Sequence, residues 1–192
     1  MLRAAVLVGV SVVVRPITAI FTPFFVTSFH GVAKSGRADV AIMYNGGIRA
    51  DLPEGTVTWG QVYQVQPFQN RLLRLTVKGV VLQDALEQCV AGSQDHLPDC
   101  HVAGAEVWYD PRKEVRKRIS RVRLGGKELD KDRTYTLVVS DFMATGGSGF
   151  GMLVGSPKED LDVVDVDALT RYLGVLRAVE APDDVRFHRT DR

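Results

Sequence analysis

The run ADVAIMYNGGIR, from Ala38 to Arg49, joins two signals around which the rest of the chain is organised. Its first half, Ala38 to Met43, is apolar and predicts a strand. The pair Gly46-Gly47 then lets the backbone turn and come close to another group. We therefore expect Asn45 and Arg49 at the C-terminal edge of a strand, where ligands commonly bind.

A second glycine-rich loop, TGGSGF, lies far downstream at residues 145–150. It also follows a β-rich run, residues 135–139. Two glycine loops after two strands predict one shared pocket. Each loop taken singly is equally compatible with an ordinary tight turn.

The composition is that of a globular protein without a strong charge. The 192 residues suffice for one domain with a well-packed core. Lys and Arg number 24 against 23 Asp and Glu, so a net charge of +1 does not support a nucleic acid polymer as partner. Positive charge gathers between Arg112 and Arg123, but Val115, Ile119 and Val122 interleave with it. We interpret this run as the solvated face of a hairpin rather than a phosphate-binding track.

The N-terminal segment, residues 1–25, is apolar and precedes a single predicted domain, residues 26–192. Arg3 followed by an uncharged run from Ala4 to Val14 has the order of a secretion signal. Arg15-Pro16 interrupts it, and neither apolar run here reaches the length of a membrane span. The segment fits an export signal or anchor, a start site placed upstream of the domain, or a buried Val-rich strand. Any membrane contact would be through this segment.

Hydrophobic periodicity predicts both strands and helices after the first glycine loop. Thr58 stands three residues before Gln61, the capping-box arrangement of a helix start. Leu73, Leu75 and Val77 alternate with polar residues, as in a half-buried strand. A helix is predicted at 80–90, and strands at 102–109, 119–124 and 135–139, with a tight turn at Gly125-Gly126. A short β-branched run follows at 163–166. The last predicted helix is capped by Asp167, reaches Leu176 and is stopped by Pro182.

The order of these elements shows no regular strand-helix-strand repeat. We therefore predict an α+β fold, in which a mixed, largely antiparallel sheet packs with helices in a single domain.

The two cysteines, Cys89 and Cys100, flank a polar loop. Their spacing allows a small disulfide-closed loop in an oxidising compartment, and equally two free thiols in a reducing one. We predict the disulfide for the case that the chain is exported.

Three motifs together resemble one protein family. They are ADVAI with NGGIRADL at 38–52, VQPFQN at 65–70, and DFMATGGSGF at 141–150. Their content and order resemble the C-terminal, substrate-binding domain of the 5'-nucleotidase and UDP-sugar hydrolase family, from about Val26 to near the C-terminus. Any one motif alone is weakly specific, whereas the ordered set is specific.

The resemblance implies a two-domain secreted hydrolase of nucleotide catabolism. A metallophosphatase domain, absent from this chain, would hold two metal ions and perform the hydrolysis. The domain seen here would grip the nucleoside and position it. The resemblance thus implies a nucleotide or nucleoside ligand, a metallophosphatase domain as partner, no cofactor on this chain, and a periplasmic or extracellular location.

The resemblance also implies roles for residues. Arg49 matches an arginine that reaches phosphate and ribose, which suits a planar fork of donors. Phe68 and Phe142 match two aromatics that sandwich the base, with about 7 Å between ring planes if each stacks at its ordinary distance. The substrate-binding residues implied are Asn45, Gly46, Gly47, Arg49, Phe68, Phe142, Gly147 and Ser148, with no catalytic and no metal-binding residue. Without the family, core packing would explain either Phe better, and an ion pair with Asp51 or Glu54 would explain Arg49.

Two positions depart from the family pattern. Tyr44 stands where the family usually has the first Asn of a pair, and Ser148 where it commonly has an Asp that binds ribose. The chain also lacks the Gly-Asn-His-(Asp/Glu) segment of the metal domain. Asp99-Cys100-His101 matches a metal pattern formally, but it has no partner motif, and we interpret it as a coincidence.

Three hypotheses follow. The first is the nucleotide-binding part of a 5'-nucleotidase-type phosphohydrolase. The second is a stand-alone, non-catalytic nucleotide- or nucleoside-binding module. The third is a decayed remnant that folds and binds nothing.

Overall fold

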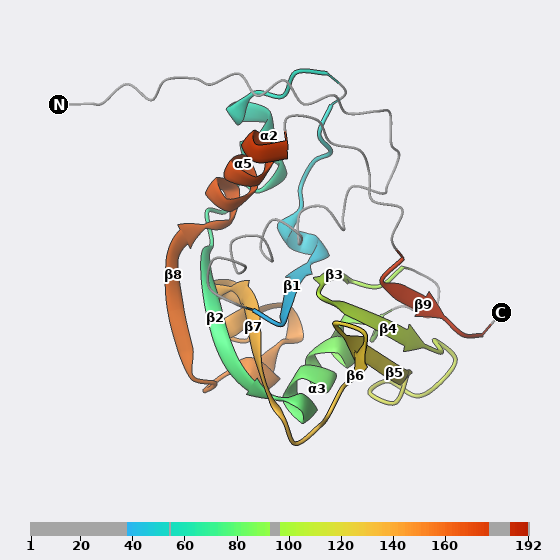
Figure 1. The fold of residues 1–192 in the computed structure, drawn as a ribbon. Coiled ribbons are helices and arrows are strands. Elements are labelled where there is room, and N and C mark those ends of the chain that lie inside the picture. The colour runs from blue at the N-terminus through green and yellow to red at the C-terminus, as the bar shows by residue number, and fades with distance from the viewer. Residues whose placement is uncertain (1–37, 54, 93–96, 177–184, 192) are drawn as a thin grey trace.

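Helices and strands alternate irregularly along residues 38–53, 55–92, 97–176 and 185–191, which the computed structural model describes (Figure 1). The helices are α2 (Trp59–Val65), α3 (Gly79–Cys89), α4 (Asp141–Ala144) and α5 (Asp165–Leu176), with 3-10 turns η1 (Asn45–Gly47), η2 (Gly147–Gly149) and η3 (Gly151–Leu153). The strands are β1 (Val40–Tyr44), β2 (Arg71–Lys78), β3 (Cys100–Ala103), β4 (Ala105–Tyr109), β5 (Ile119–Leu124), β6 (Lys127–Glu128), β7 (Thr134–Ser140), β8 (Lys158–Val164) and β9 (Phe187–Arg189).

A five-stranded sheet with strand order β3-β1-β7-β2-β8 forms the centre of the molecule. β1 and β7 are parallel, and the other three neighbouring pairs are antiparallel. Both faces of β1 and of the C-terminal half of β7 are covered, which is why residues 40–43 and 137–139 are continuously apolar and fully buried. The predicted mixed, largely antiparallel sheet in an α+β domain is confirmed.

A smaller, four-stranded sheet has the order β6-β5-β4-β9. The run predicted as one strand, 102–109, is in fact two strands in different sheets, because β3 pairs with β1 and β4 pairs with β5. Gly104 between them has a φ of +84°, a conformation that glycine adopts without strain, and the chain changes sheet there.

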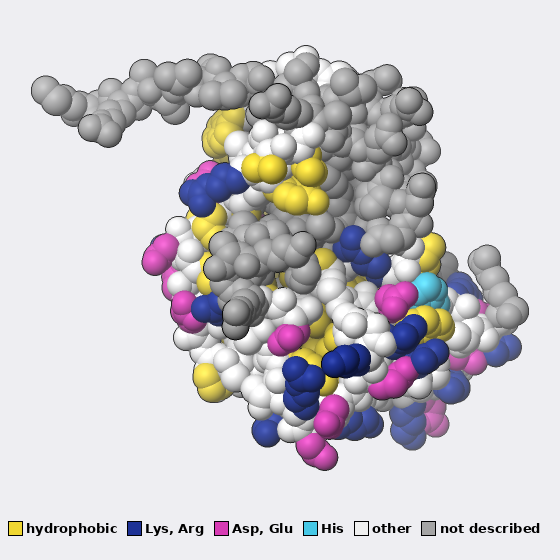
Figure 2. All heavy atoms as spheres, in the orientation of Figure 1, with side chains coloured by type: hydrophobic (Ala, Val, Ile, Leu, Met, Phe, Trp, Pro, Cys, Tyr) yellow, Lys and Arg dark blue, Asp and Glu magenta, His cyan; other side chains and the backbone are white. Residues whose placement is uncertain are grey.

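The β4–β5 pair is the hairpin expected from the basic run. Its basic side chains form ion pairs with nearby carboxylates: Lys117 with Glu114 in the connecting loop, and Arg121 with Glu128 of β6. Figure 2 shows Lys and Arg side chains mixed with Asp and Glu at this end of the molecule, so the basic run is not a uniformly positive track.

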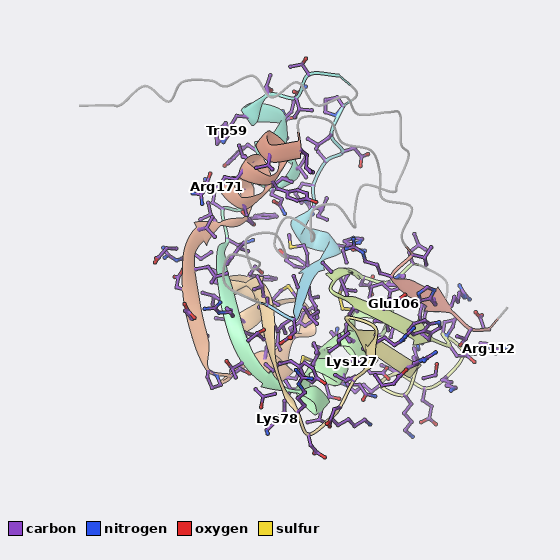
Figure 3. All side chains as sticks on the ribbon, in the orientation of Figure 1. Trp59, Lys78, Glu106, Arg112, Lys127 and Arg171 are labelled. Atoms are coloured by element: carbon purple, nitrogen blue, oxygen red, sulfur yellow. A yellow bond between two sulfur atoms is a disulfide. The ribbon has the colours of Figure 1, made fainter. Side chains whose placement is uncertain are left out.

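Helix α3 packs between the two sheets. Its residues Leu82, Ala85 and Leu86 share one core cluster with residues of β2, β4, β5 and β7. Helices α2 and α5 pack on each other at one end of the central sheet, around a second cluster that includes Val62 and Leu169. Figure 3 shows Trp59 of α2 and Arg171 of α5 at that end, and Lys78 at the opposite end of β2.

The two predicted helix starts have different outcomes. Thr58 and Gln61 form the predicted capping box at the start of α2. The last helix starts at Asp165 rather than after Asp167, because the Asp165 N–H donates to the Asn70 carbonyl at 2.9 Å and its Oδ1 accepts from the next N–H at 2.7 Å. The β-branched run at 163–166 is therefore divided between β8 and α5.

The predictions for residues 1–25 and Pro182 lie outside the described residues. None of the described helices has both the length and the apolar character needed to cross a membrane.

Candidate functional site

The first glycine loop follows β1 directly and turns toward α2. The turn is closed by the Ile48 N–H, which donates to the Asn45 carbonyl at 3.0 Å. The Arg49 N–H then donates to the carbonyl of Val65, the last residue of α2, at 2.9 Å. The loop after β1 is thereby held beside the segment after α2, which carries Phe68.

The Tyr44 ring lies over the glycine pair. A Cβ on Gly46 would stand 2.8 Å from Tyr44 Cε2, and a Cβ on Gly47 would stand 3.1 Å from Cε1. The Tyr44 ring also contacts the Phe142 ring, with centroids 5.1 Å apart and planes tilted by 35°. Phe142 in turn packs on Gly147, where a Cβ would come within 2.5 Å of the ring. The two glycine loops therefore meet through these two rings.

Arg49 and Phe68 lie together at the same edge. The Arg49 guanidinium carbon is 6.0 Å from the centre of the Phe68 ring, and Nη1 donates to the Gly46 carbonyl at 3.4 Å. Phe68 is 51% exposed and Phe142 is 42% exposed, so the core-packing alternative is wrong for both rings. Among the described residues Arg49 forms no ion pair, Asp51 included, and Glu54 lies outside them.

The backbone of the second glycine loop passes through left-handed conformations. Gly146 and Gly149 have φ of +98° and +83°, and Ser148 between them adopts +54° and is exposed. The Ser148 carbonyl accepts from Gln88 Nε2 at 3.4 Å. Because Gln88 belongs to α3, this bond holds the loop against the helix that packs between the sheets.

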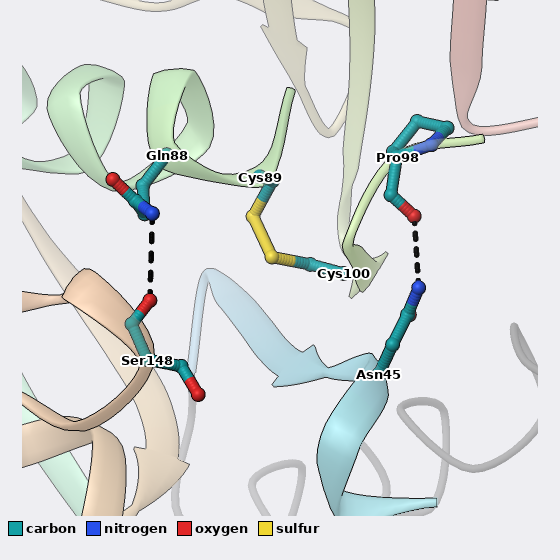
Figure 4. The surroundings of a disulfide bond; sticks show 6 residues. All are labelled: Asn45, Gln88, Cys89, Pro98, Cys100 and Ser148. Carbon is teal, nitrogen blue, oxygen red and sulfur yellow. Dashed lines mark hydrogen bonds between the residues drawn. A yellow bond between two sulfur atoms is a disulfide. The ribbon is translucent and has the colours of Figure 1, made fainter. Parts of the chain in front are cut away.

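The Cys89–Cys100 disulfide stands between the two glycine loops (Figure 4). The predicted bond is formed, with Cα atoms 5.0 Å apart. Beside it, Asn45 Nδ2 donates to the Pro98 carbonyl at 3.1 Å. The Asn45 amide thus anchors the first loop to the segment before Cys100, while Gln88, next to Cys89, holds the second loop.

A cleft of about 370 Å³ opens beside Arg49. Burial, and secondarily the charge of Arg186, lowers the pKa of His101 in its wall to about 4, so this imidazole is neutral at pH 7. Neither Phe68 nor Phe142 lines the cleft. Its described lining is Asn45, Ile48, Arg49, Ala50, Asp51, Leu97, Pro98 and His101.

A polar pair beside the site, formed by buried Asp165 and half-buried Asn70, was not predicted from the sequence. Asn70 Nδ2 donates to Asp165 Oδ2 at 3.2 Å. Burial raises the pKa of Asp165 to about 6, although the N–H donors of Val166 and Asn70 act against it. Burial, and then the Asp165 charge, also raises the pKa of Tyr44. The pair's residues are 95 apart in the chain, so no local pattern marks it.

Metal ligands do not gather in the part of the chain that the structure describes, where no three His, Cys, Asp or Glu side chains cluster. In Asp99-Cys100-His101 the central cysteine is committed to the disulfide.

Comparison with known sequences identifies one family. Residues 15–155 match the family model described as 5'-nucleotidase, C-terminal domain. The chain is 37% identical over 147 residues to the endonuclease YhcR of Bacillus subtilis, and 32% identical over 138 residues to the 5'-nucleotidase of Vibrio vulnificus. These matches cover 74% and 71% of this chain but 12% and 24% of those proteins, so the chain spans a quarter or less of their length.

Solved structures also resemble this chain. The 5'-nucleotidase precursor from Thermus thermophilus matches with a TM-score of 0.82 and 29% identity, over 88% of this chain and 35% of that one. The NAD nucleotidase of Haemophilus influenzae, at 22% identity and a TM-score of 0.75, shares the fold over 89% of this chain and 33% of its own.

Proposed function

The chain belongs to the family of 5'-nucleotidase C-terminal domains, and we propose that it binds a nucleotide or nucleoside within a 5'-nucleotidase-type phosphohydrolase. In this proposal it holds the substrate for hydrolysis by a metallophosphatase domain that lies outside this sequence.

The observation that carries the proposal is a continuous series of contacts across three loops. It runs from Phe68 to Arg49, through the glycine pair to Tyr44, and on to Phe142 and Gly147. Exposed aromatic rings stack on bases with roughly 1 to 3 kcal/mol per base and tolerate different bases. A guanidinium beside them supplies the charge that a phosphate requires.

The roles follow from these chemistries. Phe68 and Phe142 stack on the base, Arg49 reaches the phosphate, and the Gly147-Ser148 segment meets the ribose. Ser148 accepts hydrogen bonds without a charge, so its grip on the ribose is weaker than that of a carboxylate. Asn45, whose amide holds the Pro98 carbonyl, supports the loop with Gly46 and Gly47.

We place this phosphohydrolase in the periplasm or outside the cell. The Cys89–Cys100 bond supports that location, because disulfides persist mainly in oxidising compartments.

The test is to replace Arg49 by Ala and titrate the chain calorimetrically with a nucleoside monophosphate and its nucleoside. Affinity for the nucleotide should fall more than affinity for the nucleoside, by the roughly 1.5 to 3 kcal/mol of a charge-assisted bond. Arg116→Ala is the matched control, since it removes the same charge from an exposed position on the distant hairpin. Equal losses for both ligands would contradict the phosphate assignment.

A further inference from the structure

Tyr44 and Phe142 form a layered stack between the two glycine loops. Gly46 and Gly47 leave room for the Tyr44 ring, that ring contacts Phe142, and Phe142 packs on Gly147. A methyl group on Gly147 would overlap Phe142, because its Cβ would lie 2.5 Å from two ring atoms. The Tyr44 ring thus explains Gly46 and the Phe142 ring explains Gly147, whereas a Cβ on Gly47 would first meet Met43 Cε.

This packing restrains an exposed side chain. Phe142 is 42% exposed and lies on α4, a helix of only four residues. A surface ring on so short a helix is free to change rotamer unless its neighbours hold it. Here Tyr44, at the end of β1, and Gly147, in the second glycine loop, hold it, while the rest of the ring stays open to solvent.

We infer that Tyr44 is a positioning residue, which with Gly147 fixes the Phe142 ring in the orientation that receives the base. The inference rests on the proposed function, because it takes Phe142 as a stacking partner. A ring fixed before binding avoids the cost of immobilising it on binding.

The test compares a nucleoside monophosphate with ribose 5-phosphate, which has the same sugar and phosphate but no base. Tyr44→Ala should weaken nucleotide binding roughly two- to twelvefold, the factor for immobilising one side chain, and leave ribose 5-phosphate binding unchanged. Tyr44→Phe keeps the ring and should bind both as the wild type does. Tyr44→Leu, which keeps an apolar side chain of similar reach but has no ring to place against Phe142, should repeat the selective loss if Tyr44→Ala does not fold. His188→Ala is the control, because it removes a ring that stacks on Trp108 in the second sheet, at 4.5 Å between centroids.

The outcomes separate the two proposals. A folded wild-type chain that binds no nucleotide overturns the proposed function. A wild type that binds nucleotide, with the affinity unchanged in Tyr44→Ala and Tyr44→Leu, overturns only the positioning role. Equal losses for nucleotide and ribose 5-phosphate also overturn it, since Tyr44 would then hold the loop. If ribose 5-phosphate binds too weakly for direct titration, its affinity is measured by competition with the nucleotide.

Discussion

Removing the Cys89–Cys100 bond should destabilise the whole domain. The change is the double substitution Cys89→Ala with Cys100→Ala. The bond joins residues 11 apart, and closing a loop of that size restricts the unfolded chain by about 3 kcal/mol. For a domain of this size, that loss corresponds to a melting temperature lowered by roughly 6 to 12 °C.

Thermal unfolding followed by calorimetry measures the effect directly. The wild type in reductant should melt with the double variant, and reductant should not change the melting of the variant. The double substitution should also weaken nucleotide binding, because Pro98 and Gln88, beside the bond, form the hydrogen bonds that hold the two glycine loops. A melting temperature lowered by less than about 2 °C would refute the reasoning, since the bond would then constrain little.

Three further predictions concern buried charge and catalysis. Glu87→Ala should lower the free energy of unfolding by about 3 kcal/mol, because the buried Glu87 carboxylate accepts from the N–H groups of Arg118 and Ile119, at 3.1 and 2.9 Å. Chemical denaturation measures this loss. The control Glu114→Ala, at an exposed position, should leave the free energy of unfolding nearly unchanged. The pKa of Asp165 is raised from 3.8 to about 6, so its contribution to stability is complete below pH 4 and is lost as the pH rises to 6. The pKa of His101 is lowered from 6.5 to about 4, so its contribution is complete above pH 6.5 and is lost as the pH falls to 4. Each contribution is roughly 3 kcal/mol. Relative to the wild type, Asp165→Asn should therefore lose stability as the pH falls toward 4, and His101→Gln should lose stability as the pH rises toward 6.5. Unfolding free energies from urea titrations that change with pH in both variants as they do in the wild type would exclude these effects. The purified chain should release no phosphate from a nucleotide with or without added divalent metal, because its sequence lacks the clustered metal ligands of the catalytic domain, and metal-dependent release above a mock purification would contradict this.

Local sequence patterns anticipated most of the fold. Apolar runs marked β1 and β7, alternation marked β2, and the Thr58 capping box marked the start of α2. These features depend on neighbours within a few residues, which a sequence shows directly. The change of sheet at Gly104 was missed, because a glycine within an apolar run does not reveal which strands it separates.

The candidate site was anticipated less completely. The resemblance predicts Arg49, Phe68 and Phe142 as binding residues, and the structure shows that both rings are exposed. The Tyr44–Phe142 contact and the Asn70–Asp165 bond join distant segments, so only the folded chain reveals them. No local pattern indicates that the Asn45 amide holds the Pro98 carbonyl, for the same reason.

The most direct test of the central claim is calorimetric titration of the full wild-type chain with a panel of nucleoside monophosphates, their nucleosides and ribose 5-phosphate. Recognition of base and phosphate together predicts saturable binding of at least one nucleotide, tighter than binding of its nucleoside or of ribose 5-phosphate. No saturable binding of any nucleotide, in a sample that unfolds cooperatively on heating, would contradict the claim.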